Sequence, residues 1–438
     1  MTKYKKSQYN ILIEQDEEGV VLYNSYSGGI IQLENKAYES IQQTEFCFDS
    51  VLYGRELLQN GFIVNANINE FQRVKTQIES TISNHNQEMI SYVIAPTLNC
   101  NFRCVYCFQK DFRTDGNENI VTEDTLCKIK QFILNEAKGN RNLKKIKITW
   151  FGGEPMLCFE QIVSFSKQLK DTLAEHNISY VSDMITNGAL LDEDKLKVLV
   201  EDCNLKNVQI TLDGEESTYC EKKQTSTVIF KKVLENVRNA TKYIKTTVRV
   251  NADKTNFEEL QRLIKSLYLS DVNKDNLTVH FAQLRDYDCA NCEESNCFND
   301  LEYWKRKEEF YSALKALDIK GNKKGLPAFS LIPFCGLAPG HNLVIDYRGN
   351  LYKCEHYIGD ETKIVGNVYD GLFYNEVYEQ SLSLATDERC NKCSIFPCCN
   401  YSQCAAMHGF AGKDSECKCY KTQLETLKQK IKRYLEEQ

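Results

Sequence analysis

The sequence of 438 residues lacks any long apolar run, and no stretch approaches the ~18–20 apolar residues that a membrane-spanning helix needs. It also lacks a secretory signal, because no apolar stretch follows the basic N-terminus, MTKYKKSQYN. A surplus of positive charge is missing as well, since 54 Lys and Arg stand against 61 Asp and Glu. We therefore expect a cytoplasmic protein that binds neither membranes nor nucleic acid.

Cysteine, in contrast, is abundant, with 20 residues. Disulfides are rare in a reducing compartment, so local groups of cysteines there indicate metal binding. The length predicts two or three domains, and a hydrophobic content of 42% is enough for substantial cores.

The first part of the chain reads as a small separate module. Residues 19–33 alternate apolar and polar side chains around Gly28 and Gly29, which predicts a β-hairpin, and short amphipathic helices follow. This order predicts a winged-helix-like domain, for which periodicity alone favours the role of a structural cap. The pattern as a whole divides the chain into three domains, at 1–88, 89–325 and 326–438.

The middle domain alternates strands with amphipathic helices. Such alternation predicts an α/β fold with a parallel sheet and right-handed crossovers, open or closed into a partial (β/α)6 barrel of the TIM type. In these folds the chemistry lies at the carboxyl ends of the strands. Six strands are expected, at residues 91–97, 145–153, 180–188, 207–214, 246–253 and 277–284.

The last domain, 326–438, is dense in cysteine and poor in long apolar stretches. A segment with so small a core needs another source of stability, and bound metal supplies one. Residues 422–438 form an amphipathic pattern and predict a closing helix.

Three cysteines directly follow the first expected strand of the barrel, as Cys100-x3-Cys104-x2-Cys107. A structural zinc site usually needs four ligands in two C-x2-C pairs, and no fourth ligand is near. Three thiolates would instead hold three irons of a 4Fe–4S cluster and leave the fourth iron open to an outside ligand. Tyr106 and Phe108 would shield such a cluster from water.

This spacing, with the aromatic Tyr106 before the third cysteine, resembles that of the radical S-adenosylmethionine (radical SAM) enzymes. The string WFGGEP, at the end of the second expected strand, strengthens the resemblance. The resemblance implies that the backbone of Gly152 and Gly153 lies against the methionine part of SAM. It also implies that Glu154, followed by Pro155, accepts the amino group of SAM.

Three further positions resemble SAM contacts of that family. Asn187 in ITNG and Thr211 in ITLDG follow the third and fourth expected strands and would face the cofactor. Lys223 stands where many relatives carry an arginine that pairs with the SAM carboxylate. A lysine supplies charge but no bidentate fork, so a solvated surface lysine remains the alternative.

The C-terminal cysteines resemble the SPASM extension of radical SAM enzymes that modify peptides, which holds two auxiliary 4Fe–4S clusters. With the SAM-binding cluster this makes three. The resemblance implies that Cys335, Cys354 and Cys404 bind the first auxiliary cluster, and that Cys390, Cys393, Cys399 and Cys417 bind the second.

Several alternatives stay open in this region. Cys398 could replace Cys399, and Cys419 could replace Cys417. A fourth ligand to the first auxiliary cluster could come from a loop with Cys289, Cys292 and Cys297, or that loop could bind no metal. Zinc is the alternative to iron, because C-x2-C is a common zinc pair.

The resemblance implies an oxidoreductase in which a 5′-deoxyadenosyl radical removes hydrogen from a C–H bond of a peptide. The N-terminal domain resembles the leader-peptide recognition domains of maturases, which bind a precursor peptide as an added strand. The leading prediction is a maturase that installs a cross-link, first a thioether from a cysteine sulfur to carbon, with a reductant such as flavodoxin or ferredoxin.

Other functions compete with this prediction. A carbon–carbon cross-linking enzyme, an epimerase and a maturase that forms formylglycine in sulfatases use the same radical. A non-catalytic zinc or electron-carrier protein is the remote alternative. The sequence assigns no catalytic acid or base.

Overall fold

The computed structural model divides the chain into two compact units. The first, here called the terminal unit, comprises Met1–Asn84, Lys324–Gly340 and Gln380–Gln438. The second, here called the barrel unit, comprises His85–Lys323 and His341–Glu379. The structure describes residues 2–84, 87–113, 118–284, 296–298, 300–316, 326, 328–330, 335, 337–338, 340–399, 402 and 418–436.

The barrel unit is built on a curved sheet with the strand order β12-β11-β10-β9-β8-β7-β13-β14-β15-β16. Neighbouring strands from β7 to β12 are parallel, which confirms the predicted partial barrel. The six strands are β7 (Met89–Ile94), β8 (Lys145–Trp150), β9 (Ser179–Thr186), β10 (Leu205–Thr211), β11 (Lys245–Ala252) and β12 (Leu277–Gln283).

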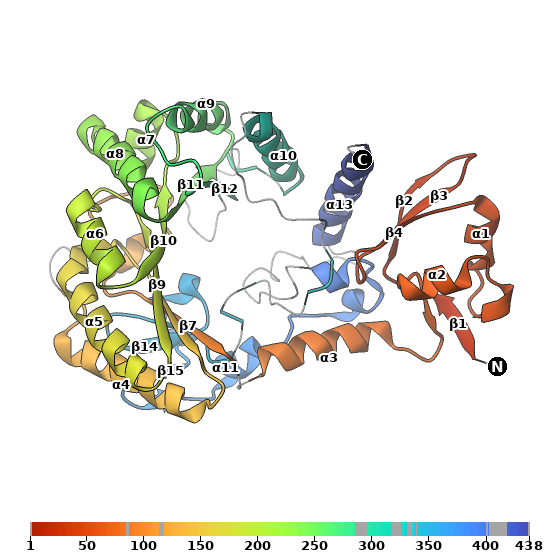
Figure 1. Cartoon of the computed structure of the whole chain (residues 1–438), viewed down its shortest axis with the longest axis horizontal. Helices are drawn as coiled ribbons and strands as arrows, with labels where there is room; N and C mark the ends of the chain where they lie inside the picture. The colour runs from red at the N-terminus through yellow and green to blue at the C-terminus, as the bar shows by residue number, and fades with distance from the viewer. Residues whose placement is uncertain are drawn as a thin grey trace. The chain divides into compact units, whose positions relative to one another are not determined.

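Helices cover the outer side of this sheet (Figure 1). At least one helix connects each of these strands to the next, as the alternating pattern predicts. The helices of the barrel unit are α4 (Glu123–Gly139), α5 (Phe159–Glu175), α6 (Glu193–Glu201), α7 (Glu216–Lys223), α8 (Thr227–Tyr243), α9 (Phe257–Tyr268) and α10 (Asp300–Ala316).

The two faces of the sheet differ in polarity, as β11 illustrates. Thr246, Val248 and Val250 are buried on the face that meets α8 and α9, whereas Thr247 and Arg249 alternate with them and are partly exposed. Burial of one aliphatic side chain of this kind stabilises the fold by about 1.5–3 kcal/mol. The outer face therefore supplies the core, and the inner face keeps polar side chains for the interior of the barrel.

The sheet continues beyond the region that the sequence assigns to the barrel. β13 (Leu343–Ile345) pairs in parallel with β7, although the sequence analysis places it in a loop-rich domain starting at residue 326. Three antiparallel strands follow, and these pieces are too short to show an alternating pattern. They are β14 (Asn350–Tyr352), β15 (Gly366–Asn367) and β16 (Gly371–Leu372).

The turn between β13 and β14 is organised by the buried carboxylate of Asp346. It accepts hydrogen bonds from the backbone N–H groups of Arg348 and Asn350, each at 2.9 Å, and from the hydroxyl of Tyr352 at 3.0 Å. Burial raises the pKa of Asp346, and these hydrogen bonds oppose that rise. Asp346 is thus a structural turn residue.

The terminal unit begins with two small antiparallel sheets and three short helices. The predicted hairpin over residues 19–33 is confirmed, with β3 paired to β4. The sheets have the orders β2-β3-β4 and β5-β1-β6. Their elements are β1 (Lys3–Lys6), β2 (Asn10–Gln15), β3 (Val20–Asn24), β4 (Ile30–Leu33), α1 (Asn35–Ser40), β5 (Phe46–Cys47), α2 (Gly54–Gln59), β6 (Ile63–Asn65) and α3 (Glu70–Ile82).

The closing helix predicted from the sequence is present as α13 (Lys418–Glu436). Its Leu427 and Ile431 pack with Ile11, Ile13 and Tyr23 of the β2-β3-β4 sheet in one apolar cluster. The chain's last helix therefore belongs to the core of the terminal unit. In the part of the chain that the structure describes, every helix is too short or too polar to span a bilayer.

Candidate functional site

The three-cysteine loop directly follows β7 at the carboxyl edge of the sheet. Cys100, Cys104 and Cys107 are all partly exposed and none is in a disulfide. The loop is pinned to the end of α7, because the N–H groups of Arg103 and Val105 donate to the carbonyls of the last two α7 residues at 3.3 and 3.0 Å. Three thiols thus lie in one loop at the edge where parallel sheets carry their chemistry.

The glycine pair after β8 lies directly against this loop. The N–H of Gly153 donates to the carbonyl of Thr97 at 3.0 Å, and the N–H of Glu154 donates to Asn99 at 2.8 Å. A Cβ on Gly153 would come within 2.1 Å of the Asn99 oxygen, and Gly152 has φ +112°. No other residue type fits here, so the sequence WFGGEP is explained by close backbone packing.

Glu154 is fully buried and ties the ends of β8 and β9 together. Its carboxylate accepts from the Met156 N–H at 3.0 Å, the Thr186 hydroxyl at 2.6 Å and the Asn187 N–H at 2.8 Å. Burial raises the pKa of Glu154, and the three hydrogen bonds oppose the rise. Two carboxylate oxygens offer about four acceptor positions, so one remains for a ligand. Pro155 starts the short 3-10 helix that follows.

Asn187 connects the end of β9 to the cysteine loop. Its side-chain amide donates to Asn101 Oδ1 at 2.7 Å and lies 3.8 Å from the Cys100 sulfur. The loop after β9 therefore reaches the first cysteine.

Tyr106 and Lys223 meet in a buried polar network at the ends of β10 and β11. Lys223 Nζ lies 2.8 Å from Asp213 Oδ2, 2.5 Å from the Tyr106 hydroxyl and 2.9 Å from Thr211 Oγ1. The Tyr106 hydroxyl also donates to Asp213, and the Asn251 amide lies 3.4 Å from that hydroxyl. Tyr106, Thr211 and Lys223, which the sequence singled out as SAM contacts, thus belong to one connected group.

The alternative of a solvated Lys223 is wrong, because the side chain is only 3% exposed. Burial alone would lower the pKa of Lys223, but the Asp213 carboxylate more than offsets this effect and raises it. The sequence analysis did not single out Asp213 and Asn251. Asp213 lies within the quoted string ITLDG, and its place after a parallel strand was the available signal.

The thiols of the loop are poor ligands unless a positive centre is present. Burial, followed by the charge of Glu154, raises the pKa of Cys100 to about 11, and burial also raises the pKa of Cys104. A metal centre would reverse this by stabilising the thiolates. Three thiols in one loop that packs closely on a glycine pair fit an iron–sulfur cluster with an outside ligand.

A single metal ion fits less well. Within the described residues, no three His, Cys, Asp or Glu side chains converge on one ion position. A four-iron cluster spreads its cysteine sulfurs around a larger core than one ion does.

The other predicted cluster ligands are distributed over both units. Cys354 follows β14 in the barrel unit, and the ring of the nearby His356 lies 4.6 Å from Phe108 of the cysteine loop. Cys335 belongs to the terminal unit, whereas Cys404, Cys417, Cys289 and Cys292 lie outside the described residues. Cys297 is disulfide-bonded, and the alternative ligand Cys419 lies in the first turn of α13.

Cys390 and Cys398 lie in two consecutive 3-10 turns of the terminal unit, Glu388–Lys392 and Phe396–Cys398, and Cys393 and Cys399 directly follow these turns. The Cys398 thiol donates to the carbonyl of Ile395 at 3.4 Å and packs in the same apolar cluster as α13. Burial raises its pKa to about 12. Cys393, a predicted ligand, packs in the same cluster, so this packing does not decide between Cys398 and Cys399.

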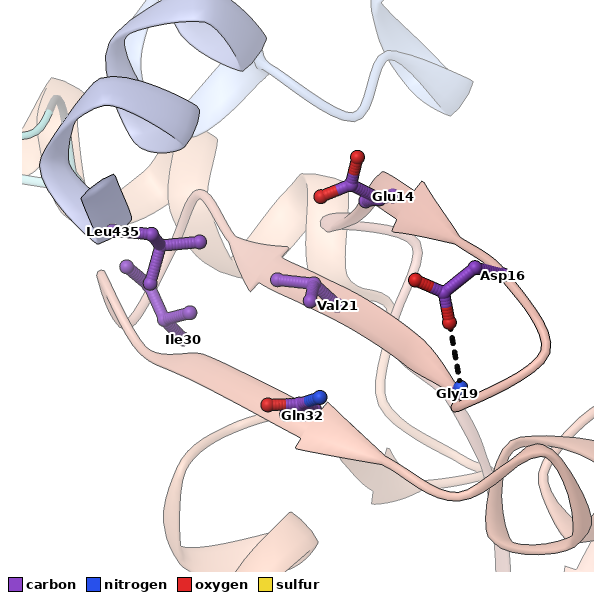
Figure 2. A pocket seen from close by; sticks show the side chains of 7 residues that line it. All are labelled: Glu14, Asp16, Gly19, Val21, Ile30, Gln32 and Leu435. Atoms are coloured by element: carbon purple, nitrogen blue, oxygen red, sulfur yellow. Dashed lines mark hydrogen bonds between the residues drawn. The ribbon is translucent and has the colours of Figure 1, made fainter.

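A pocket of about 430 Å³ lies on the β2-β3-β4 sheet of the terminal unit (Figure 2). Two acidic residues, Glu14 and Asp16, lie along one side of it, and Asp16 caps the turn by accepting from the Gly19 N–H at 3.0 Å. The other lining residues are Val21, Ile30, Gln32 and Leu435. The pocket joins apolar and acidic surface beside the edge strand β4.

Comparison with known proteins places the cysteine loop and the sheet in one family. Residues 94–267 match the model of the radical SAM superfamily. The cysteine-type anaerobic sulfatase-maturating enzyme of Clostridium perfringens is 25% identical over 346 residues, which cover 71% of this chain and 87% of that protein.

Two solved structures share the fold. The structure of anSMEcpe with bound AdoMet has a TM-score of 0.58 and 19% identity, and it covers 80% of this chain and 98% of its own. The structure of Streptococcus suis SuiB bound to S-adenosylmethionine has a TM-score of 0.55 and 13% identity. The match covers 94% of this chain and 100% of SuiB. This chain therefore contains a radical SAM domain, built on the partial barrel that carries the three-cysteine loop.

Proposed function

We propose that this protein is a radical SAM peptide maturase that installs a cross-link, first a thioether between a cysteine sulfur and a carbon of a precursor peptide. One observation carries the proposal above the others. The three-cysteine loop is packed so tightly on Gly152–Gly153–Glu154 that a single added Cβ would collide with its backbone. This packing supports the proposal because it fixes the three-thiol loop against the backbone that follows β8.

Cys100, Cys104 and Cys107 would hold the 4Fe–4S cluster, and the glycine pair would let the methionine part of SAM approach its open iron. When bound, these groups supply a 5′-deoxyadenosyl radical that removes a hydrogen atom from a peptide C–H bond, and auxiliary clusters supply an acceptor for the electron the peptide gives up. The peptide also loses its thiol proton as the sulfur–carbon bond forms.

The chain's own polar residues would orient SAM. Glu154 keeps one acceptor position for the SAM amino group, and Asn187 and Thr211 lie at the ends of the next two strands. The fully buried position of Glu154 means that its three hydrogen bonds fix the direction of that acceptor. Water is kept from the site by the rings of Phe108 and Phe151, whose centroids are 6.5 Å apart.

The auxiliary clusters remain as predicted from the sequence. Cys399 stays the proposed ligand in the run, with Cys398 as the alternative. The proposed ligand sets are Cys335, Cys354 and Cys404 for one cluster and Cys390, Cys393, Cys399 and Cys417 for the other.

The precursor peptide would bind through the terminal unit. In the sheet β2-β3-β4 the strand β4 has one paired neighbour among the described strands, so its other edge offers backbone groups to an added strand. The structure of SuiB bound to its precursor peptide SuiA covers 95% of this chain. Flavodoxin or ferredoxin remains the proposed electron donor.

Formation of formylglycine in a sulfatase is the second candidate. The identity of 25% to a sulfatase-maturating enzyme favours it. However, the structure of anSMEcpe covers 80% of this chain, whereas the structure of SuiB covers 94%. The greater share of this chain that SuiB covers, together with the structure of SuiB bound to its precursor peptide SuiA, supports a precursor-binding maturase.

Anaerobic reconstitution followed by metal analysis and product analysis tests the proposal. We expect about twelve irons per chain and little zinc, and release of 5′-deoxyadenosine after reduction. A cysteine-bearing precursor peptide should lose the mass of two hydrogen atoms. Replacement of a cysteine sulfur by an aldehyde oxygen in a sulfatase peptide would instead establish the second candidate, and absence of SAM cleavage would refute both.

A further inference from the structure

The barrel unit buries a cation beside the cysteine loop. Lys223 and Asp213 form an ion pair whose side chains are 3% and 0% exposed. A buried charge is costly unless all its hydrogen bonds are made, and Nζ of Lys223 has three oxygen partners, one each on Asp213, Tyr106 and Thr211. The ammonium group has only three N–H donors, so no donor is left for a carboxylate of a ligand.

The same residues hold the cysteine loop from two sides. Tyr106 stands between the second and third cysteines, and its hydroxyl bonds to both members of the ion pair. The carbonyl of Lys223 accepts from the N–H of Arg103, also in the loop. Side chain and backbone of one lysine thus both contact the loop.

We propose that Lys223 is a positioning residue, which fixes the cysteine loop on the ends of β10 and β11 through Tyr106 and Asp213, and not a ligand of the SAM carboxylate. The inference rests on the proposed function only in taking the loop as the cluster site. It predicts that the loop is already ordered in the protein without iron.

Hydrogen exchange on the iron-free full chain tests this proposal without any activity measurement. The variants are Lys223→Met and the milder Tyr106→Phe, which removes only the hydroxyl. We expect backbone exchange in the loop, read at Val105, to rise about tenfold or more in both variants while the strands β7–β9 stay protected. Iron bound after reconstitution should fall by about four per chain.

Lys222→Met is the matched control. Lys222 pairs with Asp253 at 2.5 Å and is 13% exposed, but its side chain makes no recorded contact with Tyr106. The control should leave loop exchange and iron content at the wild-type level. Equal effects of Lys222→Met and Lys223→Met would show a general cost of losing a buried charge and would overturn the proposal.

The affinity for SAM separates the two roles of Lys223. In Lys223→Arg protein that has taken up full iron, the dissociation constant of SAM should stay within about threefold of the wild type. Unchanged loop exchange in Lys223→Met, combined with a large loss of SAM affinity, would contradict the proposal and restore the carboxylate role.

A different observation concerns Arg249, a second cationic side chain of the barrel unit. Arg249 lies on the inner face of β11, beside Thr211 of β10 and His280 of β12 in register. Its Nε donates to Asn251 Oδ1 at 2.9 Å, and within the described residues no ion pair or other hydrogen bond engages the guanidinium. Its two terminal amino groups are therefore available, and this fork matches a carboxylate.

We infer that Arg249 binds a carboxylate inside the barrel, either that of SAM or one on the substrate peptide. Anaerobic calorimetry on iron-loaded Arg249→Met protein measures the two ligands separately, with Thr247→Val on the same face as control. One dissociation constant should rise about tenfold or more, which identifies the source, and Arg249→Lys should restore part of it. Both constants unchanged would refute the assignment.

Discussion

Two regions of the molecule contain predicted cluster ligands, namely the cysteine loop of the barrel unit and the cysteine run 390–399 of the terminal unit. They differ in the contacts that hold them in place. The loop is fixed by protein contacts, namely the backbone of Gly153 and Glu154 and the buried pair of Lys223 and Asp213. The run 390–399 is held by local turns, in which the N–H of each later residue donates three positions back along the chain. Contacts with the rest of the protein thus fix the cysteine loop, whereas we expect bound metal to fix the conformation of the run 390–399.

The difference follows from where each segment lies. The loop leaves a six-stranded parallel arrangement whose strand ends meet at one edge, so side chains from β8 to β11 reach it. The run packs through Phe396 on α3 and through Ile395 on the sheet beneath α13. A segment with so few buried side chains gains its stability from ligand binding.

The substitution Gly153→Ala attacks the packing of the loop most directly. The new Cβ would lie 2.1 Å from the carbonyl oxygen of Asn99, so the loop or the strand end must move. We expect SAM cleavage to fall by at least about 100-fold, because displacements near 1 Å have effects of this size.

Gly139→Ala is the control for that variant. Gly139 ends α4, and an added Cβ there meets no atom within 4 Å. SAM cleavage should be unchanged. A wild-type rate in Gly153→Ala would show that the close approach of backbone at the loop is irrelevant to the site.

Removal of iron should separate the two regions. After anaerobic chelation we expect residues 388–399 to lose protection from hydrogen exchange by about tenfold or more, while β7–β11 and the loop keep theirs. Mass spectrometry of the digested, exchanged chain measures both in one sample. Equal loss in both regions would mean that the loop also depends on its metal.

The neighbours Cys398 and Cys399 test which thiol of the run is a ligand. The Cys398 thiol is already bonded to the Ile395 carbonyl, so Cys398→Ala should keep full iron and lose only the packing of a small side chain. Cys399→Ala should reduce iron by about four per chain. A colorimetric iron assay of the two purified variants measures this difference. Loss of iron in Cys398→Ala, with full iron in Cys399→Ala, would make Cys398 the ligand.

Glu154→Gln has the smallest expected effect and probes the support of the loop. The new amide would place its NH2 group against hydrogen-bond donors from Met156, Thr186 and Asn187. We expect a loss of unfolding free energy of about 1–3 kcal/mol, measured by urea denaturation of the iron-free protein. An unchanged midpoint would mean that the buried carboxylate is not a structural tie.

The elements with long, regular patterns could be predicted from sequence. All six strands β7 to β12 and the hairpin of β3 and β4 occupy their expected places, because each buries one face and alternates. The extension β13–β16 was missed, since strands of two or three residues show no period. Its pairing with β7 is decided by tertiary contacts.

The candidate cluster ligands could be predicted from the sequence, but the buried side chains that hold their loop in place could not. The cysteine spacing and the glycine pair are local features, and local sequence shows them. The burial of Lys223 depends on Tyr106, more than 100 residues earlier in the chain, and on Asp213 at another strand end. Sequence alone therefore left a choice between ligand and surface residue, and neither describes the buried ion pair.

The spectrum of the reduced, reconstituted protein tests the central claim most directly, namely that Cys100, Cys104 and Cys107 hold a cluster open to SAM. Electron paramagnetic resonance should show a 4Fe–4S signal that changes when SAM is added, and 5′-deoxyadenosine should follow. The variant with Cys100→Ala, Cys104→Ala and Cys107→Ala should keep the signals of its auxiliary clusters. Added SAM should neither change its spectrum nor yield 5′-deoxyadenosine. A wild-type spectrum insensitive to SAM, or zinc in place of iron, would contradict the account.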